Sequence, residues 1–191
     1  IIFGFLSLFT VATLTSGLVN APLTKGISSA IYKDANMVAT NYLPEYFSGQ
    51  TSLNNVHMQL SGMEQHLNAA IWFVDSDGTM ITSAQSDDFP SAPYNVVDFN
   101  PAESGNEQYQ IGDYHGYFNE DVITVIAPVI YDYSPKGYLL IHKSTDDIYE
   151  LHDILMHSAY ITLGVIFTLS FVILLAFQFF VYRPLSKITE A

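Results

Sequence analysis

Residues 154–182 contain no Asp, Glu, Lys or Arg. A helix of about 29 residues is roughly 44 Å long, which is enough to cross the hydrocarbon of a bilayer and both of its interfaces. A core helix of a soluble protein is rarely so uniformly apolar, because one of its stripes faces water. Tyr160 and Tyr182 stand where aromatic belts form, and Arg183 follows directly. We therefore expect a transmembrane helix over residues 157–182.

Charge orients this span and limits the function of the rest of the chain. Of the 19 acidic residues only Glu190 follows the span, whereas Arg183 and Lys187 come directly after it. Because basic residues favour the cytoplasmic side, we expect the end beyond Tyr182 to be cytoplasmic and the acidic middle to be extracellular. Such an acidic middle segment argues against nucleic acid as a partner, and the lipid bilayer is the first partner expected.

The first residues form a second uncharged stretch, from Ile1 to Val19. A signal peptide is one reading, but Pro22 disfavours cleavage after Ala21. A buried helix is another reading, although the stretch is poorly amphipathic. A first transmembrane helix over residues 1–22 fits best, because the later span and its charge asymmetry need a partner span. The chain starts without Met, so we expect that the true N-terminus precedes it.

The next two segments have the apolar spacing of helices. Residues 24–46 place apolar side chains on one helix face, with Thr24 as N-cap and Pro44 where the pattern ends or kinks. A second helix is predicted over residues 53–67, with the preceding Thr-Ser pair as its cap.

The apolar period then changes from that of helices to that of strands. Residues 70–74 and 79–83 flank the turn sequence Asp75-Ser76-Asp77-Gly78, which predicts a β-hairpin. The polar connection 85–110 is predicted to be a loop with one short strand at 95–99, and long connections of this kind often bind ligands. Three further strands, forming an antiparallel meander, are predicted at 111–118, 122–131 and 137–142.

A last helix is predicted to start after the meander and to enter the membrane. Ser144 is its expected cap, and Asp147 follows at the capping-box spacing with Asp in place of Glu. No helix breaker lies between Thr145 and Pro184. The fold class is therefore α+β, with a long N-terminal helix and a central antiparallel sheet between two transmembrane helices.

Three stretches carry a resemblance to a known family. The sequence IWFVDSDGTMITSA at 71–84 resembles the first hairpin of extracellular Cache (PAS-like, PDC) sensor domains. The sequence VITVIAPVIYDYSPKGYLLIHKSTDDI at 122–148 resembles the last two strands of such domains. The sequence VYRPLSKITEA at 181–191 is similar to the start of a HAMP linker, which opens with a basic residue, Pro and Leu just inside the membrane.

This resemblance implies the input half of a bacterial, multi-pass cell-membrane receptor, most often a two-component sensor histidine kinase. Because the movement of one helix needs a second subunit as reference, we also expect a parallel homodimer with the N-terminal helices at its interface. A chemoreceptor or a cyclase receptor would use the same input half, and a membrane-anchored binding module is the alternative from another class. The expected divisions are transmembrane helices over 1–22 and 157–182, an extracellular sensor domain over 23–156 and the start of a cytoplasmic HAMP linker over 183–191.

The resemblance also implies the residues that carry function. In Cache domains the ligand lies between the sheet and the long loop. The ligand-binding residues it implies are Tyr94, Tyr114, His115 and Tyr117. The residues expected to transmit the signal are Ser144, Asp147, Arg183 and Pro184. Strand alternation would place Asp113 and Tyr114 on opposite faces, so these side chains are not all expected to line one pocket.

The ligand is an unknown extracellular small molecule or cation. The external domain contains no Arg, so it lacks a clamp for carboxylates, and an amine, a neutral solute or a divalent cation fits its acidity better. The sequence Asp75-Ser76-Asp77-Gly78 departs from a calcium loop, because Gly follows the second Asp directly and no Glu stands near position twelve. We expect no metal, no cofactor and no catalytic residues in this chain; the catalytic domains of a kinase would lie outside it.

Overall fold

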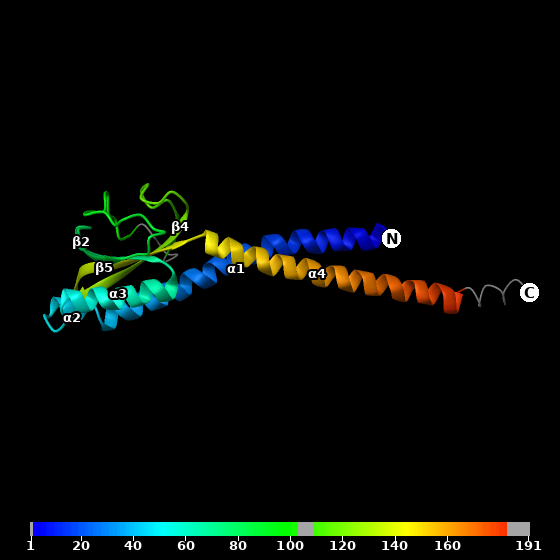
Figure 1. Ribbon diagram of the computed structural model, residues 1–191, viewed down its shortest axis with the longest axis horizontal. Coiled ribbons are helices and arrows are strands. Elements are labelled where there is room, and N and C mark those ends of the chain that lie inside the picture. The colour runs from blue at the N-terminus through cyan, green and yellow to red at the C-terminus, as the bar shows by residue number, and fades with distance from the viewer. Residues whose placement is uncertain (1, 103–108, 183–191) are drawn as a thin grey trace, which may run out of the picture. The chain divides into compact units, whose positions relative to one another are not determined.

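The computed structural model describes the backbone of residues 2–102 and 109–182, and the side chains of residues 22–102, 109–150 and 153–180. The chain forms two units, one of residues 23–148 and one of residues 1–22 with 149–191 (Figure 1). The first unit holds the sheet and the second holds the apolar helical segments, and each is described by itself below.

The apolar unit contains the start of helix α1 (Ile2–Asn41) and most of helix α4 (Asp146–Phe177), which continues as a π-helix, η2 (Gln178–Tyr182). Among the described residues, one helical stretch, Asp146–Phe180, is long and apolar enough to cross a membrane. The predicted span 157–182 lies largely within it. That residues 1–22 also cross the membrane stays a prediction.

In the sheet-bearing unit, the helix predicted to start at Thr24 is part of α1, which starts earlier in the chain. Thr24 is not an N-cap, because α1 already runs through Pro22, and the Thr24 carbonyl accepts a hydrogen bond of 2.7 Å from the Ser28 hydroxyl inside the helix. Helix α1 ends at Asn41, and the short helix α2 (Pro44–Phe47) starts at the predicted proline.

Helix α3 (Leu53–Leu67) has the predicted bounds. The Ser52 hydroxyl of the predicted cap accepts a hydrogen bond of 3.3 Å from the backbone N–H of Asn55. The helix ends at Asn68, which has a left-handed backbone with φ of 48° and ψ of 61°. Asn tolerates this conformation better than most residues, so it can end the helix in the way that glycine usually does.

The sheet confirms the predicted α+β class. Its strands, all antiparallel, are β1 (Ala70–Asp75), β2 (Met80–Ala84), β3 (Tyr109–Gly112), β4 (Val122–Tyr131) and β5 (Ser134–Ser144), in the order β2-β1-β5-β4-β3. The predicted hairpin and the predicted meander are both present. Strand β5 starts three residues before the predicted position, because Asp132 and Tyr133 adopt positive φ and close a tight hairpin turn.

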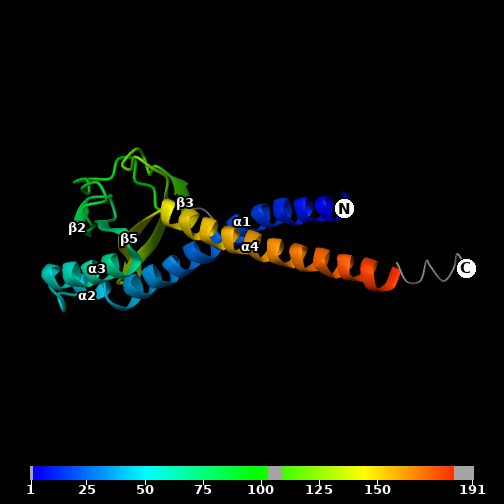
Figure 2. The ribbon, with the colours of Figure 1, turned by 45° about the vertical axis from the view of Figure 1, so that its right-hand side comes forward.

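The two faces of the sheet have different cover. Ile71, Phe73 and Ile141 alternate onto one face and pack against buried side chains of α1 and α3, such as Val38 and Leu60. The opposite face carries a second cluster, which includes Trp72, Leu140, Phe118 and parts of the connection between β2 and β4. Both views show α3 along one face and the long connection over the other (Figures 1 and 2). The buried pair of Thr124 and His142 lies on this second face.

The long connection differs from the prediction in two places. The predicted strand 95–99 is reduced to a single bridge between Thr79 and Asn95. Strand β3 ends at Gly112 and does not reach Phe118, because the residues from 113 to 118 form a turn that the Phe118 N–H closes on the Asp113 carbonyl at 3.1 Å.

A pair of glycines tests the packing of the sheet. A Cβ on Gly137 of β5 would lie 2.5 Å from the Val74 carbonyl oxygen, whereas a Cβ on the exposed Gly62 of α3 meets nothing within 4 Å. We expect Gly137→Ala to destabilise the domain by about 1–3 kcal/mol through overpacking. Gly62→Ala should stabilise it by about 0.5–1 kcal/mol. Chemical unfolding of both variants measures this, and equal effects would contradict the register of β1 and β5.

Candidate functional site

A cavity of about 310 Å³ lies where β3 ends beside β4. Its lining residues are Gln110, Ile111, Gly112, Asp113, Tyr114, His115 and Thr124. They bring an amide, a carboxylate, an imidazole and a hydroxyl together around one hollow, with the apolar Ile111 beside them. A small number of polar groups in a partly apolar cavity is the usual make-up of a site for a small ligand.

The turn after β3 explains why neighbouring residues line the same cavity. Tyr114, His115 and Gly116 have consecutive positive φ values of 43°, 59° and 76°. Because this segment is not extended, the strand alternation predicted for Asp113 and Tyr114 does not apply, and both line the cavity. Left-handed backbone costs a non-glycine residue of order 1 kcal/mol or more and persists only where the surrounding structure enforces it.

Packing of the Tyr114 ring provides that enforcement. Tyr114 is only 4% exposed, and its ring centroid lies 4.6 Å from that of His142 and 6.1 Å from that of Trp72. Phe118, at the other end of the turn, stacks on Trp72 at 5.7 Å. The turn is thus anchored at both ends by aromatic rings that pack on the sheet.

His142 is the polar centre of this aromatic cluster. It is fully buried, and its Nδ1 lies 2.8 Å from the hydroxyl oxygen of Thr124, its partner in the pairing of β5 with β4. Its ring lies 4.3 Å from Trp72 and 4.9 Å from Phe118. Burial lowers the pKa of His142 from 6.5 to about 3, so the imidazole is neutral at physiological pH.

The predicted ligand-binding residues are only partly brought together. Tyr114 and His115 line the cavity, whereas Tyr94 and Tyr117 do not. Tyr94 is 83% exposed, and Tyr117 holds the connecting loop instead, because its hydroxyl accepts from the Val97 N–H at 2.9 Å and donates to the Asn95 carbonyl at 3.2 Å. Whether Tyr114 or His115 contacts a ligand stays a prediction.

Sequence reasoning did not single out Gln110, Thr124 or His142. The sequence pattern could have indicated two of them. Side-chain alternation along the predicted strands places Thr124 on one face with Val122 and Ile126, and His142 on one face with Leu140. Recognising the pair also required the register of β4 on β5, which no local pattern gives. Asp75 behaves as a turn residue, since its Oδ1 accepts from the N–H groups of Asp77 and Thr79, both at 2.9 Å.

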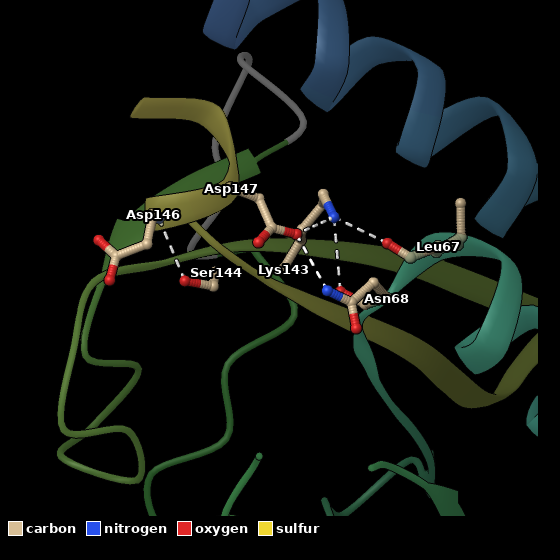
Figure 3. A network of polar contacts seen from close by, with 6 residues as sticks. All are labelled: Leu67, Asn68, Lys143, Ser144, Asp146 and Asp147. Carbon is tan, nitrogen blue, oxygen red and sulfur yellow. Dashed lines mark hydrogen bonds and ion pairs between the residues drawn. The ribbon is translucent and has the colours of Figure 1, made fainter. Parts of the chain in front are cut away.

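A second polar site joins the end of β5 to α3 (Figure 3). The Lys143 ammonium donates to the Leu67 carbonyl at 2.8 Å and pairs with the Asp147 carboxylate at 2.8 Å. The Asn68 amide donates to the same carboxylate oxygen at 3.2 Å. We call Asn68, Lys143 and Asp147 the helix clamp, because it ties the C-terminus of α3 to the first turn of α4. The hydrogen bond from Lys143 is the main cause of a lowered pKa of Asp147, and the Asn68 amide adds to it.

The start of α4 is also held on the cavity side of the sheet. The Asp121 carbonyl accepts two hydrogen bonds from Thr145, one from its N–H at 3.1 Å and one from its hydroxyl at 2.8 Å. Asp121 ends the segment that begins with the cavity residue Asp113. The first turn of α4 is therefore connected both to α3 and to the cavity wall.

The predicted transmission residues are found here in part. Ser144 accepts a hydrogen bond of 3.1 Å from the Asp146 N–H, but the predicted capping box does not form, because Asp147 turns to Lys143 instead. Arg183 and Pro184 lie outside the described residues. A role in signal transmission stays a prediction for all four residues.

No protein-family model and no curated protein sequence matches this chain. Among solved structures, the extracellular domain of the protein named as histidine kinase vpHK1S-Z8 is similar, with 14% identity, a TM-score of 0.54, and coverage of 74% of this chain and 60% of that one. A domain of a protein from Vibrio parahaemolyticus, named as a sensory box/GGDEF family member, has 13% identity, a TM-score of 0.54 and coverage of 73% and 61%.

This chain thus spans about three fifths of the length of those two chains. At these identities the similarity concerns the fold alone. The chain shares its fold with this extracellular domain and this sensory-protein domain, and the resemblance inferred from the sequence is confirmed at the level of the fold.

The buried His142 predicts how stability depends on pH. Its pKa is lowered in the folded state, so the unfolded chain takes up the proton first, and stability present above pH 6.5 is lost as the pH falls towards 3. We expect this group to lower the free energy of unfolding by about 2 kcal/mol between pH 7 and pH 5. His142→Gln, which can still bond Thr124, should flatten that slope, whereas His66→Gln on the exposed face of α3 should not. Parallel slopes for the parent and His142→Gln would contradict the assignment.

The helix clamp predicts a second dependence of stability on pH, in a more acidic range. Because the pKa of Asp147 is depressed, its contribution is complete above the usual value of 3.8 and is lost as the pH falls through the lower folded-state value. At neutral pH we expect Asp147→Asn to cost roughly 0.5–1 kcal/mol, since water screens this partly exposed pair. The neighbouring Asp146→Asn controls for the helix dipole. The difference between the two variants, followed by chemical unfolding, should vanish in acid; a difference that persists there would refute the ion pair.

Proposed function

We propose that this chain is the input half of a transmembrane signal receptor, in which the sheet-bearing unit senses a small solute or ion outside the cell. Support comes from the fold it shares with extracellular sensor domains and from the cavity at the end of β3. Support also comes from the apolar stretch Asp146–Phe180, which has the length and composition of a membrane span.

The observation that carries the proposal is the connection between the cavity wall and α4. The segment from Asp113 to Asp121 forms the wall at one end and bonds Thr145 at the other. A ligand that shifts Asp113 or Tyr114 changes the strain on the Asp121 carbonyl, and therefore on the residue that precedes α4. A ligand transmits a signal only through its different affinity for two arrangements, and the coupling is typically about 1–3 kcal/mol.

The finer assignment follows from the resemblance of residues 181–191 to a HAMP start. We propose that Arg183 and Pro184 pass the movement of the membrane helix to HAMP on the cytoplasmic side. We also propose a parallel homodimer with the N-terminal helices at its interface, because a movement of one helix needs a reference in a second subunit. A two-component histidine kinase is the output we favour; a chemoreceptor or cyclase would use the same input, and the type of output domain distinguishes them.

A matched pair of tryptophan substitutions tests the sensory role. Ile111 lines the cavity and is 50% exposed, whereas Ile130 lies near the β4–β5 turn and is 56% exposed. We expect Ile111→Trp to fill the cavity and abolish the response to solutes, and Ile130→Trp to leave it intact. The measurement is kinase autophosphorylation in membrane vesicles, with residue 191 fused to the HAMP and kinase portion of a receptor of known output.

The solute panel for this assay contains amino acids, amino alcohols, sugars, organic acids and divalent cations. The proposal expects at least one class to change the output of the parent fusion. A parent that responds to none of them, or two tryptophan variants that behave alike, would refute a sensory role for this cavity.

A further inference from the structure

Two buried nitrogen atoms near the cavity have no hydrogen-bond partner among the described residues. They are Nε1 of Trp72 and Nε2 of His142, and both side chains are fully buried. Burial of a polar atom without a partner is unfavourable, because the atom loses its water and gains no bond in return. Such atoms are rare in folded proteins and need an explanation. A ligand atom that reaches them would be such an explanation.

Two lining residues contact the rings that carry these nitrogens. Tyr114 lines the cavity and packs on both rings, at 6.1 Å from Trp72 and 4.6 Å from His142. Thr124 also lines the cavity, and its hydroxyl lies 2.8 Å from Nδ1 of His142. The His142 imidazole is therefore in contact with the lining residue Thr124. The rings of His142 and Trp72 both pack against the lining residue Tyr114.

The backbone of Tyr114 favours movement of that side chain. Its φ of 43° lies in the left-handed region, where a tyrosine is strained, and His115 follows with φ of 59°. A conformation with negative φ at Tyr114 would relieve this strain. Displacement of the ring would extend the cavity to the two buried nitrogens.

The charge of the lining selects the kind of ligand. Among the described lining residues, Asp113 is the carboxylate, it is exposed, and none is a lysine or arginine. An anion would meet this carboxylate without a compensating charge, whereas a cation would pair with it. The indole N–H of Trp72 can only donate, so the ligand atom that reaches it must accept.

We propose that this cavity binds a small organic cation that also carries a hydrogen-bond acceptor, such as a protonated amino alcohol. The ammonium pairs with Asp113 at the mouth. The acceptor bonds the Trp72 N–H, beside the neutral His142, after Tyr114 has moved aside. This inference rests on the proposed sensory function and adds to it the class of ligand.

The only tryptophan of the chain is Trp72, so its indole N–H gives a single resonance that reports on the site. The experiment uses the full chain in lipid nanodiscs, with ¹⁵N-labelled tryptophan, and three probes with the same carbon skeleton: aminopentanol, pentanediol and hydroxypentanoate. We expect only aminopentanol to shift the indole resonance downfield in a saturable way. Asp113→Asn should weaken this binding about tenfold or more, as for loss of a hydrogen bond to a charged group. Asp132→Asn, in the exposed β4–β5 turn, should bind like the parent.

Each of the other outcomes would contradict one part of the inference. Binding of pentanediol or hydroxypentanoate that is insensitive to Asp113→Asn would overturn the cationic class and leave the sensory role intact. Calorimetric binding of aminopentanol without a change at Trp72 would overturn the part played by the buried nitrogens. If no probe binds, the inference fails, whereas the sensory role is judged separately by the output of Ile111→Trp against Ile130→Trp.

Discussion

The hydrogen bond between Thr124 and His142 is the constraint from which the rest of the site follows. It fixes a neutral imidazole in the middle of a sheet face that is otherwise aromatic and aliphatic. The buried imidazole packs against the aromatic rings of Trp72, Tyr114 and Phe118. Closing Tyr114 over this ring obliges β3 to end at Gly112, and the early end of β3 leaves the cavity.

The same stretch of β5 reaches both faces of the sheet within a few residues. Because side chains alternate along a strand, His142 lies on the cavity face and Lys143 on the opposite side, where it bonds the Leu67 carbonyl of α3. Thr145 then returns to the cavity side through Asp121, and α4 begins at the next residue. The start of α4 is thus sensitive to changes on either face, although each individual bond is modest in strength.

Elements defined by local periodicity could be predicted from the sequence, and elements defined by long-range packing could not. Helix α3 and its Ser52 cap, the hairpin at Asp75 and the bounds of β4 follow from spacing and turn chemistry, which act over a few residues. The turn at Tyr114 does not, since a tyrosine prefers negative φ, and packing on His142 and Trp72, far away in sequence, opposes that preference. The assignment of the exposed Tyr94 to the site rested on its residue type and on the family resemblance, and neither carries information on the direction of a side chain.

The free-energy contributions at Tyr114 are compatible with two conformations, one with its ring packed (closed) and one with its ring displaced (open). Two left-handed residues, Tyr114 and His115, disfavour the closed form by about 1–3 kcal/mol each, and the unpartnered nitrogens of Trp72 and His142 disfavour it further. Aromatic packing of Tyr114 returns about 0.5–1.5 kcal/mol for each ring pair, in addition to the burial of its area. Because these opposing contributions are of similar size, the inference requires that the conformations with Tyr114 packed and with Tyr114 displaced differ by no more than a few kcal/mol. At such a difference the displaced form would be populated to about 0.1–10%, and a ligand would reverse a 1:99 ratio only by binding that form about 10⁴-fold more tightly.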